Sequence, residues 1–126
     1  MSKIVEGLYY SENHEWIKVD GDLATIGVTD HAQGEMGDVV YVDCGTVGAL
    51  VSKGDAVAVV ESVKAASDVY TPVSGEITAV NDELSGEPEK INADAFGAFL
   101  FTVKMSDSSQ LAGLMNAGEY KAFCQE

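Results

Sequence analysis

The sequence predicts a mainly β fold, a sandwich or barrel of short strands flanked by short helices. Short runs rich in valine, isoleucine and aromatic residues recur at near-regular spacing, with glycine-containing turns between them. No long helical segment separates these runs, which argues against the crossover connections that a parallel α/β sheet requires. A chain of 126 residues suits a single domain with a core of ordinary size.

The clearest element is a hairpin over residues 16–28. Asp20 and Gly21 form a pair that tolerates the positive φ values of a type I′ turn. After this turn, apolar side chains alternate from Ala24 to Val28, which predicts a strand with one buried face.

A short helix is expected next, because Thr29 or Asp30 can cap its start and Gly37 can end it. Residues 37–45 then predict a strand with two apolar faces. One face carries Val40, Val42 and Cys44, and the other carries Val39 and Tyr41. The aromatic side chains expected in the core are Trp16, Tyr41, Phe99 and Phe101.

Four further strands are expected at residues 56–61, 67–72, 76–80 and 99–105, the last with well-alternating side chains. Between the last two, residues 81–92 are typical of short helical turns, with Pro88 well placed at a helix start. From Ser106 onward, apolar side chains recur at helical spacing. This pattern predicts two short amphipathic turns or helices that cover the sheet.

The chain is strongly acidic, with 21 Asp and Glu against 7 Lys and Arg and a formal net charge of −14. Such a surface repels phosphate, which argues against binding to nucleic acids and to anionic membranes. It favours low self-association, so we expect a monomer, and it steers the chain toward protein partners with basic docking faces. No apolar run approaches the roughly 20 residues of a membrane helix. The start of the chain carries no export or transit signal, which indicates a cytoplasmic protein, although a trimmed mitochondrial form would look similar.

The cysteines and histidines suggest neither a metal site nor a catalytic centre. Cys44 and Cys124 lie in unlike contexts and form no C-x-x-C pair. His14 belongs to the string HEW, which lacks the second histidine of the H-E-x-x-H zinc motif, and His31 has no spaced partner. We therefore expect packed or surface histidines, reduced thiols, no bound metal and no catalytic residue.

One lysine stands apart, in the segment VVESVKAASDVY at residues 59–70. Glycine-containing turns at residues 53–55 and 73–76 bracket this segment, so Lys64 falls at or beside a hairpin tip, among small side chains. A lysine that another enzyme must modify needs a protruding amine, small neighbours and a fixed backbone, and a hairpin tip supplies all three. A helix would crowd the amine with side chains three and four residues away. The residues alone leave two interpretations, an attachment point for a prosthetic arm and an ordinary solvated turn lysine.

The sequence around this lysine closely resembles the lipoyl-attachment segment of glycine cleavage system H proteins, over GDAVAVVESVKAASDVYTPVSGEITAVN. The resemblance extends to the first half of the chain, over YYSENHEWIKVDGDLATIGVTDHAQGEMGDVVYVD, and to the ending AGEYKAFCQE. It covers nearly the whole chain and implies a barrel-sandwich hybrid fold of the lipoyl/biotinyl type, with short flanking helices that include the C-terminal end. It also implies a single lipoyl-carrier domain over residues 1–126, with lipoic acid joined to Lys64 as N6-lipoyllysine.

In this family the lipoyl arm carries an aminomethyl group between enzymes. The resemblance implies that the chain takes this group from the P protein, a pyridoxal-phosphate glycine decarboxylase. It delivers the group to the tetrahydrofolate-dependent T protein, an aminomethyltransferase, and the L protein, a dihydrolipoyl dehydrogenase, reoxidises the arm. Lipoylating enzymes are further implied partners. By this interpretation the chain is a carrier and catalyses nothing by itself.

The resemblance also implies two groups of site residues. Those expected to help a lipoylating enzyme recognise the hairpin are Glu61, Ser62, Val63 and Ala65. Two carboxylates, Glu15 and Asp68, match positions where the family lines a cleft for the loaded, cationic arm, which must be shielded from water. The alternatives are a solvated hairpin residue for Glu15 and, for Asp68, a turn residue bonded to its own backbone.

The chain departs from the family pattern in two places. A common Leu-Pro is Cys44-Gly45 here, and the common Asp-Pro-Tyr and Gly-Trp-Leu strings are replaced at residues 94–96 and 98–100. These changes bear on local packing and on docking to partners, and they leave the attachment segment intact.

Other carriers are alternatives. Lipoyl domains of 2-oxoacid dehydrogenases typically show Asp-Lys-Ala at the tip and continue into linkers, whereas Val63 precedes the lysine here. Biotin carriers normally show Met-Lys-Met at this point, and Val63 and Ala65 beside the lysine argue against this alternative. A relay protein that supplies lipoyl groups to other enzymes, or an unmodified relative with a binding role, stays open.

Overall fold

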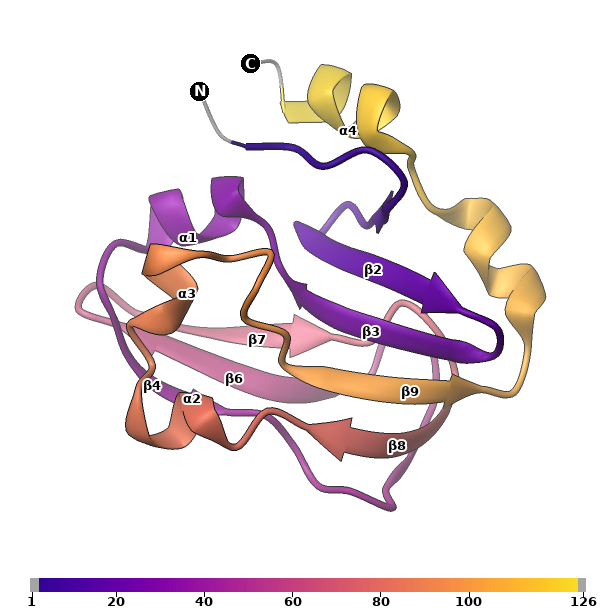
Figure 1. Ribbon diagram of the computed structural model, residues 1–126, viewed down its shortest axis with the longest axis horizontal. Coiled ribbons are helices and arrows are strands. Elements are labelled where there is room, and N and C mark those ends of the chain that lie inside the picture. Colours follow the sequence, from indigo (N-terminus) through magenta and orange to yellow (C-terminus); the bar gives the residue numbers. More distant parts are fainter. Residues whose placement is uncertain (1–2, 125–126) are drawn as a thin grey trace.

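A computed structural model describes residues 3–124 as two antiparallel β-sheets. The strands are β1 (Tyr9–Tyr10), β2 (Glu15–Asp20), β3 (Leu23–Val28), β4 (Val39–Asp43), β5 (Leu50–Val51), β6 (Ala56–Ser62), β7 (Ala66–Tyr70), β8 (Gly75–Val80) and β9 (Phe101–Met105). The larger sheet has the order β1-β2-β3-β9-β8-β5, and the smaller has the order β4-β6-β7. Figure 1 shows the two sheets as the layers of an open sandwich. The predicted mainly β, barrel-sandwich architecture is confirmed.

Short helices flank the sheets. They are α1 (Asp30–Met36), α2 (Glu83–Gly86), α3 (Lys90–Ala93), the 3-10 helix η1 (Ser108–Gly113) and α4 (Ala117–Cys124). In Figure 1, α1 and α3 lie next to each other at one end of the sandwich, and α4 lies beside the N-terminal segment. The helical ending is confirmed as far as residue 124, and residues 125–126 lie outside the described part. Within residues 3–124, no helix combines the length and apolar character needed to cross a bilayer.

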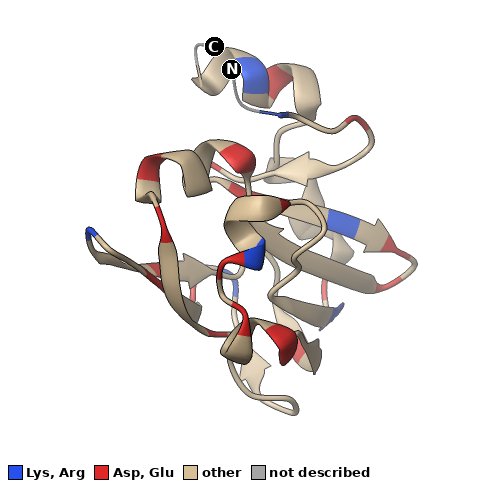
Figure 2. Ribbon diagram, turned by 60° about the vertical axis from the view of Figure 1, so that its left-hand side comes forward, with Lys and Arg blue, Asp and Glu red and all other residues tan. Residues whose placement is uncertain are grey.

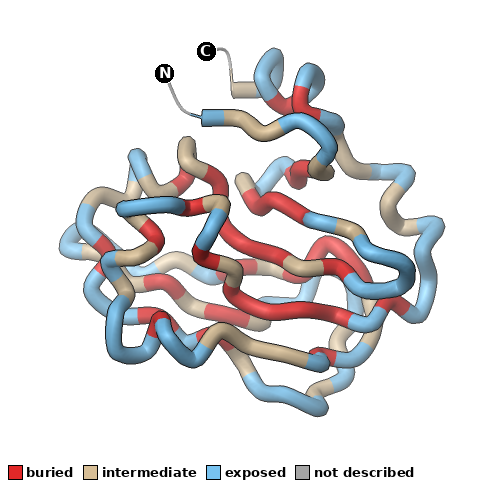
Figure 3. The backbone as a smooth tube through the Cα atoms, viewed as in Figure 1, coloured by how far each residue is buried: buried red, intermediate tan, exposed pale blue. Residues whose placement is uncertain are grey.

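The main core lies between the two sheets. Figure 3 shows buried residues along the middle of the strands and exposed residues in many of the connecting loops. The alternation predicted for β3 is confirmed, because Ala24, Ile26 and Val28 are all buried. A second apolar cluster packs α4 against β1, where the Tyr10 and Tyr120 rings stack with 4.5 Å between their centroids. The C-terminal helix is therefore part of the packed structure.

The turn between β2 and β3 differs from the expectation by one residue. Asp20 pairs with Leu23, so Gly21 and Asp22 form the two-residue loop. Gly21 has a φ of 63°, and Asp22 is not among the described residues with positive φ. A type I′ turn needs positive φ at both central residues, so the predicted turn type is wrong, and the φ pattern is that of a type II′ turn.

The predicted faces of β4 are also wrong. Val39 and Val42 are buried, whereas Val40 and Tyr41 are 55% and 48% exposed. The cause is a bulge, because the pairing of β4 with β6 shifts register between Val39 and Tyr41. One extra residue on a strand moves every later side chain to the opposite face. Tyr41 is therefore a surface residue and not the core aromatic that we expected.

The observed limits of β7 and β9 differ from those predicted from the sequence. β7 runs from Ala66 to Tyr70, one residue earlier at its start and two earlier at its end than expected, and β9 begins at Phe101 rather than at Phe99. The predicted alternation over residues 99–105 placed Leu100 on the face opposite Phe99 and Phe101. Leu100 is nevertheless completely buried, because it lies before the strand begins. Strands β1 and β5 have no counterpart among the predicted elements, since two residues carry no periodic signal.

The predicted helix caps around α1 are confirmed. The Thr29 hydroxyl accepts a hydrogen bond from the Ala32 N–H at 3.2 Å, and Gly37 ends the helix with a φ of 80°. Asn92 of α3 then holds the chain as it leaves the helix. Its Oδ1 accepts from the Val39 N–H at 2.8 Å, and its Nδ2 donates to the Gly37 carbonyl at 2.9 Å. The end of α1 is thereby fixed beside the β6–β7 hairpin.

The residues at which the chain departs from the family pattern, Cys44 and the segment 94–96, make contacts with their own surroundings. Cys44 is buried, its thiol donates to the Asn81 carbonyl at 3.5 Å, and burial raises the pKa of the thiol to about 11. The Ala95 carbonyl accepts from the Trp16 indole N–H at 3.1 Å, and the Phe96 ring lies 6.1 Å from the Trp16 ring. These contacts lie away from the hairpin that carries Lys64.

Candidate functional site

Lys64 lies at the tip of the hairpin that joins β6 to β7, and Ser62 shapes this tip. The Ser62 N–H donates to the Ala65 carbonyl at 2.9 Å, which closes the turn. The Ser62 hydroxyl oxygen accepts from the N–H groups of Lys64 at 3.2 Å and of Ala65 at 3.3 Å. A serine side chain thus binds backbone donors that would otherwise face water. The turn has a defined geometry made within four consecutive residues.

The hairpin tip rests on the end of α1. The Val63 N–H donates to the Asp38 carbonyl at 3.0 Å, and the Lys64 ammonium donates to the Glu35 carbonyl at 3.2 Å. Lys64 is exposed, and Val63 is 67% exposed. In Figure 1 the tip projects from the end of the smaller sheet, near α1. The amine is accessible, while the backbone that carries it is anchored.

Beside this tip lies a cleft of about 420 Å³. Its lining includes Lys64 together with both carboxylates that the resemblance assigns to an arm cleft, Glu15 and Asp68. Aliphatic and methionine side chains that line it are Val28, Ala32, Met36, Ala65 and Val69. Residues of β2, β3, α1 and the β6–β7 hairpin, distant in the sequence, therefore meet around one cavity.

Glu15 is 1% exposed, so the alternative of a solvated hairpin residue is wrong. Its Oε1 accepts from the Ser11 hydroxyl at 2.7 Å, and its Oε2 accepts from the Tyr70 N–H at 2.8 Å. The second bond joins β2 of the larger sheet to β7 of the smaller one. Burial raises the pKa of Glu15, and the two hydrogen bonds oppose this rise. The carboxylate is both a link between the sheets and a polar group in the cleft wall.

Asp68 and Glu61 lie on the two strands of the hairpin. Asp68 is exposed on β7 and pairs with Val59 of β6, so the alternative of a turn residue is wrong. Glu61 is half-buried on β6, opposite Ala66 of β7 and Tyr41 of β4. Acidic groups therefore stand on both sides of the lysine tip.

The acidic character extends over the molecule. Figure 2 shows Asp and Glu at many positions along the ribbon and Lys at isolated ones, in keeping with the net charge of −14. Lys90 is engaged by two carboxylates, Glu83 at 2.8 Å and Glu87 at 3.4 Å. Lys64, in contrast, donates to the backbone carbonyl of Glu35. Exposed ion pairs contribute little to stability, so this charge acts mainly at long range on approaching partners.

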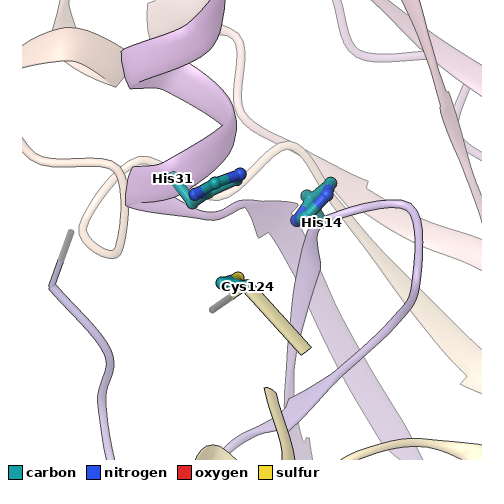
Figure 4. Close-up of side chains that lie close together, drawn as sticks. All are labelled: His14, His31 and Cys124. Carbon is teal, nitrogen blue, oxygen red and sulfur yellow. The ribbon is translucent and has the colours of Figure 1, made fainter. Parts of the chain in front are cut away.

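The fold also brings together three side chains that sequence spacing does not connect, His14, His31 and Cys124. Figure 4 shows them converging from the turn before β2, from α1 and from the end of α4. One nitrogen or sulfur of each lies within 4.8 Å of those of the other two. The expectation of no metal site rested on motifs along the chain, and such motifs do not report a cluster built from three separate segments.

Comparison with known proteins bears on both the fold and the cleft. The family model described as glycine cleavage H-protein matches residues 8–126, which include the hairpin, the cleft and α4. This chain belongs to the glycine cleavage H-protein family. The resemblance seen in the sequence is thereby confirmed.

H proteins from several bacteria match along nearly their whole length. The glycine cleavage system H protein of Thermoanaerobacter pseudethanolicus is 52% identical, over 98% of both chains. That of Escherichia coli O45:K1 is 51% identical, over 100% of this chain and 99% of the other. A crystal structure of a glycine cleavage system H protein from Mycobacterium marinum has a TM-score of 0.89 at 32% identity and covers 98% of this chain and 100% of its own.

Proposed function

We propose that this H-protein family member is the lipoyl carrier of a glycine cleavage system, and that residues 1–126 form a single lipoyl-carrier domain. The observation that carries the proposal is the position of Lys64, exposed at the tip of the β6–β7 hairpin beside a cleft lined by Glu15 and Asp68. The relatives that match over their full length are themselves glycine cleavage system H proteins.

The residues at the tip fit lipoic acid joined to Lys64 as N6-lipoyllysine. The exposed amine can form an amide, while the Ser62 turn and the Val63–Asp38 hydrogen bond hold the backbone for a lipoylating enzyme. We propose that this enzyme recognises the hairpin through Glu61, Ser62, Val63 and Ala65. The bound group would supply a disulfide that can accept both electrons and a carbon unit.

We propose that the cleft shields the loaded arm. An aminomethyl group on sulfur carries a cationic amine and is readily hydrolysed, so it needs a negative partner and restricted access of water. Glu15 supplies a carboxylate in a buried wall, where a charge interacts more strongly than in water. Asp68 supplies a second carboxylate, and the apolar side chains of Val28 and Met36 limit hydration.

The proposed cargo route involves three enzymes. The chain would take the aminomethyl group from the pyridoxal-phosphate P protein, deliver it to the tetrahydrofolate-dependent T protein, and be reoxidised by the L protein. The chain itself presents the arm and catalyses none of these steps. Its negative charge would attract partners and lipoylating enzymes that have basic docking faces. We further propose a cytoplasmic monomer.

Intact mass of the protein from its native host, with peptide mapping across residue 64, tests this proposal. A lipoyl adduct on Lys64 alone would support it. An unmodified Lys64, in cells whose other lipoyl proteins are modified, would contradict it. Deletion of the gene separates the carrier from the relay. Loss of a carrier stops glycine cleavage and leaves other lipoyl proteins modified. Loss of a relay protein leaves those other proteins without their lipoyl groups.

Ser62→Ala is expected to slow lipoylation of Lys64 about tenfold, because the turn loses the hydroxyl that binds the N–H groups of Lys64 and Ala65. The cost in free energy of unfolding should be about 1 kcal/mol. The rate is measured by mass spectrometry with a purified lipoylating enzyme. Ser67→Ala, on the β7 strand of the same hairpin, is the control. Equal rates for the two variants would exclude a positioning role for Ser62.

Glu15→Gln is expected to shorten the life of the loaded arm about tenfold, because a neutral amide binds an ammonium group less strongly than a carboxylate does. The amide can still accept from the Tyr70 N–H and donate to the Ser11 hydroxyl, so the fold should persist. Release of formaldehyde from the loaded protein measures the hydrolysis. Glu12→Gln, exposed in the turn before β2, is the control, and unchanged release from the Glu15 variant would count against the cleft role.

The same variant has a defined effect on the pH dependence of stability. Because burial raises the pKa of Glu15, the folded state binds its proton more tightly than the unfolded state does. Tighter proton binding stabilises the folded state at pH values below the pKa that Glu15 has in the unfolded chain. This stabilisation is lost as the pH rises through the higher pKa that Glu15 has in the folded protein. Urea unfolding from about pH 4 to about pH 8 should therefore show the wild type losing stability relative to Glu15→Gln.

A further inference from the structure

His14, His31 and Cys124 form the cluster that the proposed carrier function does not use. His14 precedes β2, His31 lies in the first turn of α1, and Cys124 ends α4. The two imidazole rings stack with 4.6 Å between their centroids, and one donor atom of each of the three residues lies within 4.8 Å of the others. All three side chains are half-buried rather than free in solvent. The cluster is thus a convergence of two nitrogen donors and one sulfur donor.

Each histidine is oriented by a neighbour. The Nδ1 of His14 lies 2.8 Å from the Tyr120 hydroxyl, which also lies 2.7 Å from the Thr29 hydroxyl. The Nε2 of His31 lies 3.0 Å from Oε1 of Glu35. Imidazoles that bind metals are commonly held in this way, with one ring nitrogen hydrogen-bonded to a hydroxyl, carbonyl or carboxylate partner.

A metal ion binds only the neutral imidazole of a histidine. The thiol of Cys124, in contrast, must lose its proton when a metal binds.

We propose that His14, His31 and Cys124 bind one Zn²⁺ ion. Two imidazoles and a thiolate are donors that zinc prefers, and three protein ligands leave a fourth position for water. Tetrahedral zinc with these ligands separates its donor atoms by about 3.5 Å. The donors therefore need to close by about 1 Å, and Cys124 can supply this shift because it is the last residue of α4.

Zinc at this place would join three segments that are far apart in the sequence. It would tie the end of α4 to the turn before β2 and to the start of α1, where the Tyr120 hydroxyl already links α4 to His14 and Thr29. His14 also lines the cleft beside Lys64. The ion would hold one wall of that cleft and the C-terminal helix in a fixed relation, and binding requires no modification of Lys64.

Titration of the full chain with Co²⁺ and Zn²⁺ tests the site, with any lipoyl arm kept in its disulfide form so that a dithiol does not bind the metal. Co²⁺ should produce a sulfur-to-cobalt charge-transfer band at one equivalent, and Zn²⁺ should remove it. Zn²⁺ at a hundredfold excess over its Kd should raise the melting temperature by about 5–10 °C.

Cys124→Ser should abolish the charge-transfer band and weaken zinc binding at least tenfold. Cys44→Ser is the matched control, because Cys44 is the other cysteine and lies away from the cluster, and it should leave both signals unchanged. His31→Gln should also weaken binding while leaving the thiol in place. A band that survives Cys124→Ser, or equal zinc affinity in wild type and Cys124→Ser, would overturn the proposal.

Discussion

Lys64→Arg is expected to abolish lipoylation and to reduce glycine cleavage to background. An amide to lipoic acid requires a primary amine that can be deprotonated, and a guanidinium stays charged and cannot take its place. In this chain no neighbouring lysine can substitute, because the lysine nearest in the sequence, Lys53, lies in a different turn. The expected loss is therefore complete rather than partial.

The fold should not change. Lys64 is exposed, and its side chain donates one hydrogen bond, to the Glu35 carbonyl, which arginine can also form. Surface substitutions of this kind usually alter the free energy of unfolding by no more than about 0.5 kcal/mol. Urea unfolding of wild type and variant should therefore superimpose, so that lost activity is not lost structure.

The measurement is release of labelled carbon dioxide from glycine in a mixture of P, T and L proteins, with protein lipoylated in the same host. Lys53→Arg is the matched control, since Lys53 is also exposed in a glycine-containing turn. It should behave as wild type. Activity of Lys64→Arg above background, or a lipoyl adduct elsewhere on that variant, would refute the assignment of Lys64 as the attachment point.

The lysine hairpin could be predicted from the sequence because its determinants are local. The turn is closed by contacts between Ser62 and Ala65, and the strands on either side pair with each other. A glycine-containing turn at each end of the segment is enough to place Lys64 near the tip. Local pattern and final structure agree here because few distant contacts are needed.

The cleft depends on distant contacts, and sequence patterns describe it less well. Whether Glu15 is solvated or buried is decided by its bond to the Tyr70 N–H, 55 residues away. The bulge that exposes Tyr41 likewise arises from the pairing of β4 with β6 and leaves no mark in the alternation of side chains. The resemblance supplied Glu15 as a candidate, but only the fold shows that both of its oxygens are engaged.

The cluster of His14, His31 and Cys124 was beyond sequence reasoning for the same reason. Zinc motifs are recognised by short spacings along the chain, whereas these three side chains lie in separate segments and meet when α4 packs on β1. The stacking of Tyr10 on Tyr120 positions α4 and so decides where Cys124 falls. A signal could have come from the histidines and cysteines that belong to no motif and that the C-terminal helix could reach.

Gly75→Ala is expected to be strongly destabilising. Gly75 begins β8 and lies between two neighbours, paired with Val51 of β5 and Met105 of β9. A Cβ built on Gly75 would overlap the Lys104 carbonyl oxygen and would lie 2.9 Å from Cγ1 of Val103. The first of these atoms belongs to the backbone of the paired strand and cannot rotate away.

The added methyl group must therefore force β8 and β9 apart, at the junction that also holds β5 in the larger sheet. We expect a loss of about 3 kcal/mol or more in the free energy of unfolding, measured with urea. Gly34→Ala, at an exposed position in α1 with nothing within 4 Å of the new Cβ, is the control and should stabilise by about 0.5–1 kcal/mol. A loss below about 1 kcal/mol for Gly75→Ala would show that β8 and β9 do not approach as closely as described. Because the Lys64 hairpin lies in the smaller sheet, those molecules of the Gly75→Ala variant that remain folded should still be lipoylated.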